Sequence, residues 1–274
     1  MRSLFAKYQD AWLRGDSVTP EVPALFNCVG RELVDLRFNA VVDQTQTWMT
    51  EVRPVGTERW AMAPLEAEDM ETFECCADKL GLLRAIEPAR GEYTMGVVLG
   101  ATYSAMERRL KKLRADIECG LVSIQELIIV TGVRPINEDE KRVFASAGIE
   151  PIAATEADAA RLLLSRTSLP DIPYVGVASA PNRKDGKRAT TEETIFQLAQ
   201  RVNGGSKLLF ASHMPFLRQM LTVERALDPT SWRYGVDFTF APPAKPTDQL
   251  VNVIIDEACR LLYELSKRPA PTPV

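Results

Sequence analysis

The chain has 274 residues, of which 46% are hydrophobic and 26% charged, and its formal net charge is -4. A chain of this size and balance folds around its own core without disulfides or metal, and its charge gives no overall attraction to nucleic acid. The single histidine, His213, excludes sites built from several histidines. The five cysteines form no Cys-x-x-Cys pair, which favours a reducing compartment, and we expect a cytoplasmic protein.

The first 92 residues predict a helical cap or subdomain. Leu4, Phe5, Tyr8 and Trp12 recur at helical spacing, and Gly15 ends that run. A second helix is predicted over residues 24–49 and a third after Pro64, with no convincing strand between them. No apolar run approaches the ~20 residues of a membrane helix, and charge interrupts the N-terminus too often for a secretory signal.

From Tyr93 the pattern changes to short apolar runs that alternate with amphipathic stretches, which is typical of βαβ units. Strands are predicted at 95–101, 127–132, 174–178 and 207–211, with 149–153 as a further candidate and 232–240 as an edge strand. Helices are predicted at 104–118, 137–147, 157–165, 191–201, 215–226 and 248–267. Residues 93–267 therefore form the predicted α/β domain, followed by a flexible tail at 268–274. The strands are continuously apolar, which predicts a mostly parallel sheet covered on both faces.

Parallel strands joined by right-handed crossovers place their carboxyl ends on one edge, where open α/β sheets bind ligands. Four segments should meet at this edge, namely 100–109, 131–140, 187–194 and 211–218. Each contributes a helix N-terminus, and most carry a hydroxyl beside an arginine. Because free backbone N–H groups at helix N-termini attract anions, the sequence predicts a polar pocket that accepts an anion.

Several residues at this edge have two interpretations. Arg109 and Arg134 suit phosphate or carboxylate binding. His213 could act as an acid, a base or a donor, or could bond only to the backbone at a helix start. Glu140 and Glu193 could accept protons or bind ribose hydroxyls, or could be ordinary acids of a first helical turn. The basic run 108–114 is a solvated helix face in the simpler interpretation and a nucleic-acid site in the other.

Common nucleotide and hydrolase motifs do not occur. There is no Gly-x-x-x-x-Gly-Lys-Ser/Thr loop, and no Gly-x-Gly-x-x-Gly follows the first strand. The segment around Ser179 lacks the final glycine of a nucleophile elbow. The sequence thus disfavours P-loop chemistry, ordinary NAD binding and a Ser179 hydrolase.

The motifs over residues 95–226 resemble the YdcF-like family, which includes the SanA-like envelope proteins and is also described as a domain of unknown function. The four motifs are Leu99-Gly100 with Arg109, Thr131-Gly132 with Glu140, Thr191-Glu-Glu-Thr194, and Ser212-His213 with Arg218. Thr194 stands where the family usually has asparagine, and Val133 replaces a typical further glycine.

The resemblance implies a Rossmann-like three-layer α/β/α sandwich that binds a nucleotide-type or phosphorylated small molecule, with S-adenosylmethionine as one candidate, and that could support a transferase or hydrolase reaction. It implies His213 and Glu193 as catalytic residues and no metal. The ligand-binding candidates are Gly100, Ala101, Ser104, Arg109, Thr131, Gly132, Arg134, Glu140, Thr191, Thr194, Ser212 and Arg218.

A second hypothesis is a non-catalytic interaction protein that retains the fold and binds a protein partner through its N-terminal helices. Exposed Trp48, Trp60 and neighbouring apolar residues would support it, because contiguous apolar patches mark interfaces. Under the first hypothesis the expected partner is a small-molecule ligand. Neither hypothesis predicts binding to nucleic acid or to a membrane.

Overall fold

The computed structural model describes residues 6–53, 62–146, 148, 154–186, 189–212, 216–227, 235–240 and 248–267. The chain divides into two compact units. The first, here called the helical unit, contains Met1–Arg84, Met214–Leu221 and Pro242–Val274. The second, the sheet unit, contains Ala85–His213 and Thr222–Ala241. The predicted boundary after residue 92 lies near this division, but the prediction placed the C-terminal helix with the sheet, whereas the structure groups it with the N-terminal helices.

The helical unit begins with a short helix and a two-stranded hairpin that turns at Gly15, whose φ of 61° suits glycine. The predicted helix over 24–49 is two helices, because the chain leaves the first at Gly30, with φ 70°, and resumes at Phe38. The sequence predicted no strand in this region, so the β1–β2 hairpin also differs from the prediction. The elements are α1 (Ala6–Trp12), β1 (Leu13–Arg14), β2 (Ser17–Val18), α2 (Glu21–Asn27), α3 (Phe38–Val52), α4 (Met70–Lys79) and α10 (Asp248–Ser266).

Helices α3 and α10 pack together although about 200 residues separate them in the chain. The Gln46 side chain donates to the carbonyl of Cys259 (3.1 Å), and Arg53 pairs with Asp256 (2.9 Å), whose side chain is fully buried. Trp48 is also buried and packs edge-to-face on Phe26. The bonds of Gln46 and Arg53 to α10 explain why that helix belongs to the helical unit.

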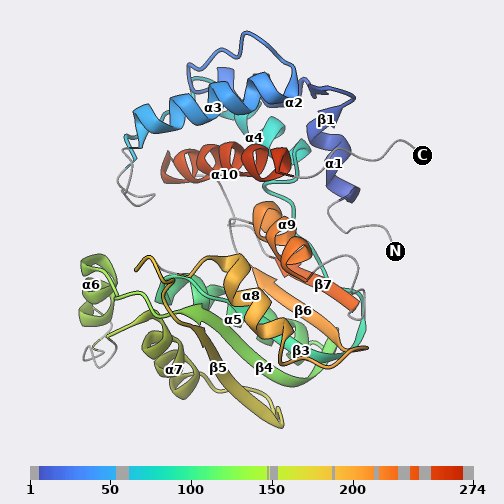
Figure 1. The fold of residues 1–274 in the computed structure, drawn as a ribbon, viewed down its shortest axis with the longest axis vertical. Helices are drawn as coiled ribbons and strands as arrows, with labels where there is room; N and C mark the ends of the chain where they lie inside the picture. The colour runs from blue at the N-terminus through green and yellow to red at the C-terminus, as the bar shows by residue number, and fades with distance from the viewer. Residues whose placement is uncertain are drawn as a thin grey trace. The chain divides into compact units, whose positions relative to one another are not determined.

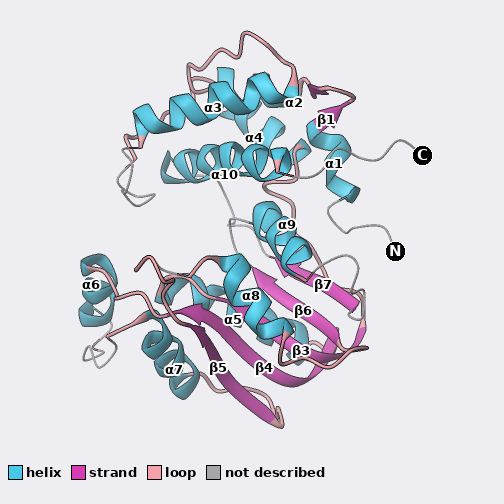
Figure 2. Cartoon of the chain, viewed as in Figure 1, coloured by secondary structure: helices cyan, strands magenta, loops and turns pink. Residues whose placement is uncertain are grey.

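The sheet unit contains five parallel strands in the order β5-β4-β3-β6-β7 (Figure 2). The strands are β3 (Gly91–Leu99), β4 (Val122–Gly132), β5 (Tyr174–Ala180), β6 (Lys207–Ser212) and β7 (Gly235–Phe240). The helices are α5 (Tyr103–Glu118), α6 (Glu138–Ser146), α7 (Glu156–Arg166), α8 (Thr191–Ala199) and α9 (Phe216–Ala226), of which α9 contributes residues to both units. The predicted strand at 149–153 lies outside the described residues.

Helices cover both faces of the sheet, as the continuously apolar strands predicted. On one face Leu110 of α5, Phe144 of α6 and Leu163 of α7 join a common core with Leu127 and Ile129 of β4. On the opposite face α8 packs against β4 and β5 through its buried Ile195 and Leu198 (Figure 1). The Rossmann-like three-layer α/β/α fold is therefore confirmed.

None of the described helices combines the length and the apolar composition that crossing a bilayer requires.

Candidate binding site at the carboxyl edge of the sheet

The chain changes direction within the sheet at β3. From β3 it passes through α5 to β4 and then to β5, which extends the sheet on one side. From β5 it returns through α8, on the opposite face, to β6 on the other side of β3. The crossover helices α5 and α8 therefore lie on opposite faces, and the strand order reverses between β3 and β6, which is the topological switch point where open α/β sheets bind ligands.

Gly100 follows β3 at this point, and its lack of a side chain is required. Its N–H donates to the carbonyl of Val130 at 2.6 Å. A Cβ on Gly100 would lie 2.6 Å from that oxygen and 2.8 Å from the Cα of Thr131. Both are backbone atoms that cannot move aside cheaply. The motif glycine thus allows the end of β3 to lie against the end of β4.

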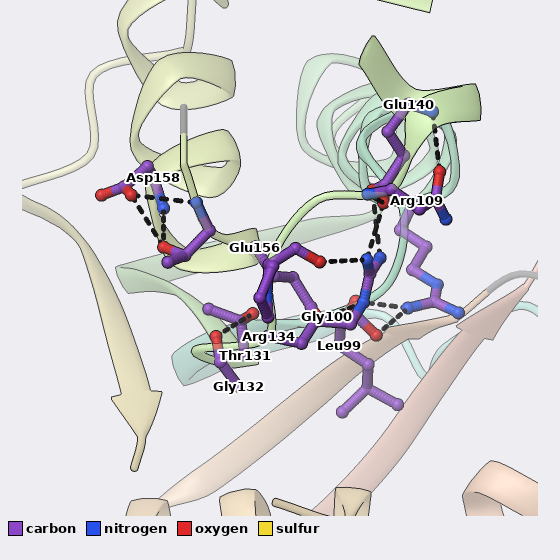
Figure 3. Close-up of polar contacts among 12 residues, drawn as sticks. Leu99, Gly100, Arg109, Thr131, Gly132, Arg134, Glu140, Glu156 and Asp158 are labelled. Carbon is purple, nitrogen blue, oxygen red and sulfur yellow. Dashed lines mark hydrogen bonds and ion pairs between the residues drawn. The ribbon is translucent and has the colours of Figure 1, made fainter. Parts of the chain in front are cut away.

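Arg109, a predicted ligand-binding residue, braces the same turn from α5. Its guanidinium donates to the carbonyls of Leu99 and Gly100, the latter at 3.0 Å, and the residue is only 2% exposed. An arginine ten residues along the chain thereby fixes the last peptide of β3 and the first residue of the turn (Figure 3). The carbonyl acceptors of this turn are occupied by the protein itself.

Arg134 forms the centre of a buried ion cluster beside this turn (Figure 3). Its two terminal nitrogens bind both oxygens of Glu140, at 2.6 and 3.0 Å, and its Nε lies 3.0 Å from Glu156. The exposed fractions of the three side chains are 12%, 5% and 10%. Arg134 joins the loop after β4 to the first turns of α6 and α7. Its guanidinium therefore binds two carboxylates of the protein itself.

Side chains cap three of the helices that begin at this edge. In α6, Asn137 and Glu140 exchange hydrogen bonds with each other's backbone N–H. Thr155 with Asp158 caps α7, and Thr190 with Glu193 caps α8, in the same reciprocal way. In α5, by contrast, the Thr102 side chain makes no capping hydrogen bond.

Glu193, a predicted catalytic residue, has its pKa lowered below its usual value of 4.5, mainly by the hydrogen bond from the Thr190 backbone N–H. Since the carboxylate is favoured, its stabilising effect is present above pH 4.5 and is lost as the pH falls through the lowered pKa. We expect Glu193→Gln to lower the free energy of unfolding at pH 7 by under ~1 kcal/mol, because the side chain is half-exposed. Denaturant unfolding should show that this difference shrinks at pH 3.5; a difference independent of pH would contradict the capping role.

The structure brings together one group of the predicted residues: Gly100, Arg109, Thr131, Gly132, Arg134 and Glu140. Ala101 and Ser104 lie on the adjoining turn and first helical turn, and Ser212 is the buried last residue of β6. Thr191 and Thr194 form a separate group at the start of α8, where the Thr194 hydroxyl donates to the Thr191 carbonyl. Arg218 belongs to the helical unit, where it pairs with Glu257 at 3.2 Å. His213 lies outside the described residues.

Glu156 is the member of the cluster that sequence reasoning missed. Its carboxylate binds Arg134, and one of its oxygens would lie 2.6 Å from a Cβ on Gly100. The available signal was the Thr155-Glu-Ala-Asp158 capping pattern, which places Glu156 in the first turn of a helix at the ligand edge.

The basic run on α5 consists mostly of residues that have partners within their own helix or are buried. Lys111 pairs with Glu107, Lys112 with Asp116 and Arg114 with Glu118, each four residues apart, and Arg109 is buried. Most of its charge is thus balanced within the helix. Within the described ranges, no group of three or more His, Cys, Asp or Glu side chains is placed to hold a metal ion.

The chain was compared with models of known families, with curated proteins and with solved structures, and nothing matches in any of the three comparisons. The resemblance to the YdcF-like family therefore depends on the four sequence motifs.

Proposed function

We propose that the sheet unit binds a nucleotide-type or phosphorylated small molecule, S-adenosylmethionine among the candidates, at the switch point between β3 and β6. The observation that carries this proposal is the strand order β5-β4-β3-β6-β7, with α5 and α8 crossing on opposite faces. In open α/β sheets of this order the crevice beyond the carboxyl ends is where ligands bind.

The chemistry of the turn after β3 favours an anionic group on the ligand. Arg109 occupies the carbonyls of Leu99 and Gly100, so the turn has few acceptors to offer. The first turn of α5 carries backbone N–H donors and the positive end of a 16-residue helix, without a side-chain cap from Thr102. Two or three charge-assisted hydrogen bonds of ~1.5–3 kcal/mol each would give roughly micromolar to millimolar affinity.

Within this proposal the protein is YdcF-like and cytoplasmic, and a transferase or hydrolase reaction would use His213 and Glu193 as its acid–base residues. The five cysteines are all free in the structure, which supports a reducing compartment. Arg109 bonds to the turn after β3, and Arg134 bonds to the first turns of α6 and α7. Both arginines therefore position these segments of the chain.

Isothermal titration against nucleotides, sugar nucleotides and S-adenosylmethionine tests the proposal, with native mass spectrometry of freshly purified protein to detect a co-purified metabolite. Ala101→Asp places a carboxylate at the turn, and we expect it to weaken binding at least ~10-fold because a like charge then faces the ligand anion. Ser123→Asp is the matched control, since it adds the same charge at an exposed position near the amino end of β4.

Two results would contradict the proposal. One is the absence of heat with every compound together with no co-purified molecule. The other is an equal loss of affinity in Ala101→Asp and Ser123→Asp, which would show that charge at this turn has no particular effect.

The hypothesis of a partner-binding N-terminal region receives less support. Trp48 is 7% exposed rather than exposed, because it packs on Phe26, and Trp60 lies outside the described residues. Trp48 therefore offers no apolar surface, although Val34 and Leu36, before α3, are exposed.

A further inference from the structure

The two edges of the sheet differ in how they are covered. At β7 the segment of residues 86–89, which precedes β3, bonds to the outer side of the strand. Ile86 and Phe240 exchange both backbone hydrogen bonds, each at 3.0 Å, and the N–H of Ala89 donates to Asp237 at 2.7 Å. An uncovered strand edge is a template for pairing with another chain, and this segment occupies the Phe240 end of β7.

At β5, the other edge, no strand of the described chain pairs with the outer side. The strand reads Tyr-Val-Gly-Val-Ala-Ser-Ala, and six of its seven residues are exposed or half-buried. It contains none of the lysines, inward-pointing charges or internal prolines that commonly block edge pairing. Pro173 and Pro181 stand just outside it and limit the pairing segment to these residues.

The side chains along β5 also offer apolar surface. Tyr174 is 55% exposed, and its ring lies over Gly176, since a Cβ there would be 2.9 Å from the Tyr174 hydroxyl oxygen. Phe196 of α8, a helix that packs on β4 and β5, is 56% exposed. Exposed aromatic residues are enriched at protein interfaces, so Tyr174 favours a contact at this strand.

We propose that β5 is the pairing edge for a second copy of this chain, so that two five-stranded sheets join through antiparallel β5 strands into one continuous sheet. A twofold axis at Val177 would place Tyr174 opposite Ala180, Val175 opposite Ser179 and Gly176 opposite Ala178. Each pair sets a larger residue against a small one or two small ones together, and no pair opposes like charges.

The sequence of β5 favours a second copy over a foreign peptide. A twofold contact uses the same surface on both chains and must therefore complement itself. An uncharged strand with its large residue at one end and a small one at the other meets that requirement. Because one strand pair is a small interface, dimerisation should depend on concentration in about the micromolar range.

Sedimentation velocity of the full chain between about 1 and 500 μM tests this proposal. We expect a monomer–dimer equilibrium in the wild type. Ala178→Lys places two ammonium groups beside the axis, and Tyr174→Lys removes the exposed ring, so each should raise the dimer dissociation constant at least ~10-fold. Gln125→Lys, at an exposed position in β4, is the matched control and should leave the constant unchanged.

Hydrogen exchange provides a readout that needs no variant. The backbone amides of residues 174–180 should exchange more slowly at 500 μM than at 1 μM, whereas those of β7 should not change. A wild type that stays monomeric throughout, a dimer that persists in both lysine variants, or concentration-independent exchange in β5 would each overturn the proposal. A monomer that captures an added β-strand peptide would assign this edge to a different partner and would also overturn it.

Discussion

Replacement of Arg134 by methionine is expected to lower the free energy of unfolding by about 3–5 kcal/mol. The guanidinium satisfies both oxygens of Glu140 and one of Glu156, and all three side chains are largely buried. Without it, two carboxylates remain close together with little water around them. Urea unfolding followed by far-ultraviolet circular dichroism measures the effect.

Arg161→Met is the control for this experiment. Arg161 also pairs with a carboxylate, that of Asp158 at 2.9 Å, but the two side chains are 59% and 38% exposed. Exposed ion pairs contribute little, so a loss of under ~1 kcal/mol is expected. If both substitutions destabilise the protein equally, the buried cluster does not hold α6 and α7 in the way described.

Gly100→Ala should lower the free energy of unfolding by about 3 kcal/mol, at the upper end of what overpacking costs. The added methyl group would approach the Val130 carbonyl and the Glu156 carboxylate to 2.6 Å each. The end of β3 would have to separate from β4, which would also break the contacts of Arg109 with this turn. A thermal melt followed by circular dichroism should show the loss as a lower midpoint.

Gly132, which ends the neighbouring strand β4, provides the comparison. The nearest atom to a Cβ on Gly132 is the Arg134 nitrogen at 4.0 Å, an ordinary contact. Gly132→Ala should therefore change the stability by no more than ~1 kcal/mol. Similar losses in the two variants would mean that the close approach at Gly100 is not what requires glycine there.

The local signals in the sequence were sufficient for most of the sheet unit. Continuous apolar runs such as Leu127–Val130 predicted buried parallel strands, and the amphipathic stretches between them predicted helices. These features depend on neighbours in the chain, so a pattern read along the chain can detect them. The break between α2 and α3 was missed because apolar spacing continues through residues 28–37.

The candidate site was predictable in position but not in detail. The order of strands and motifs predicted that Gly100, Thr131 and Arg134 would lie close together, and they do. The sequence could not show that Arg134 would meet Glu156 or that Arg109 would meet the carbonyls of β3. Such partners depend on how the loop after β4 returns past α7, which no local pattern encodes. The arginines near hydroxyl residues therefore suggested contacts with a ligand, whereas Arg109 and Arg134 bond to groups of the protein itself.

The grouping of α10 with α3 has a consequence for biosynthesis. Residues 38–52 leave the ribosome long before residues 248–266. The contacts between α3 and α10 can therefore form only when translation is almost complete. The sheet strands, all contained within residues 91–240, emerge earlier and can assemble first. Chains stalled or cleaved before residue 248 should then carry a formed sheet and an α3 helix that lacks its α10 contacts, and such products would be natural substrates for chaperones and proteases.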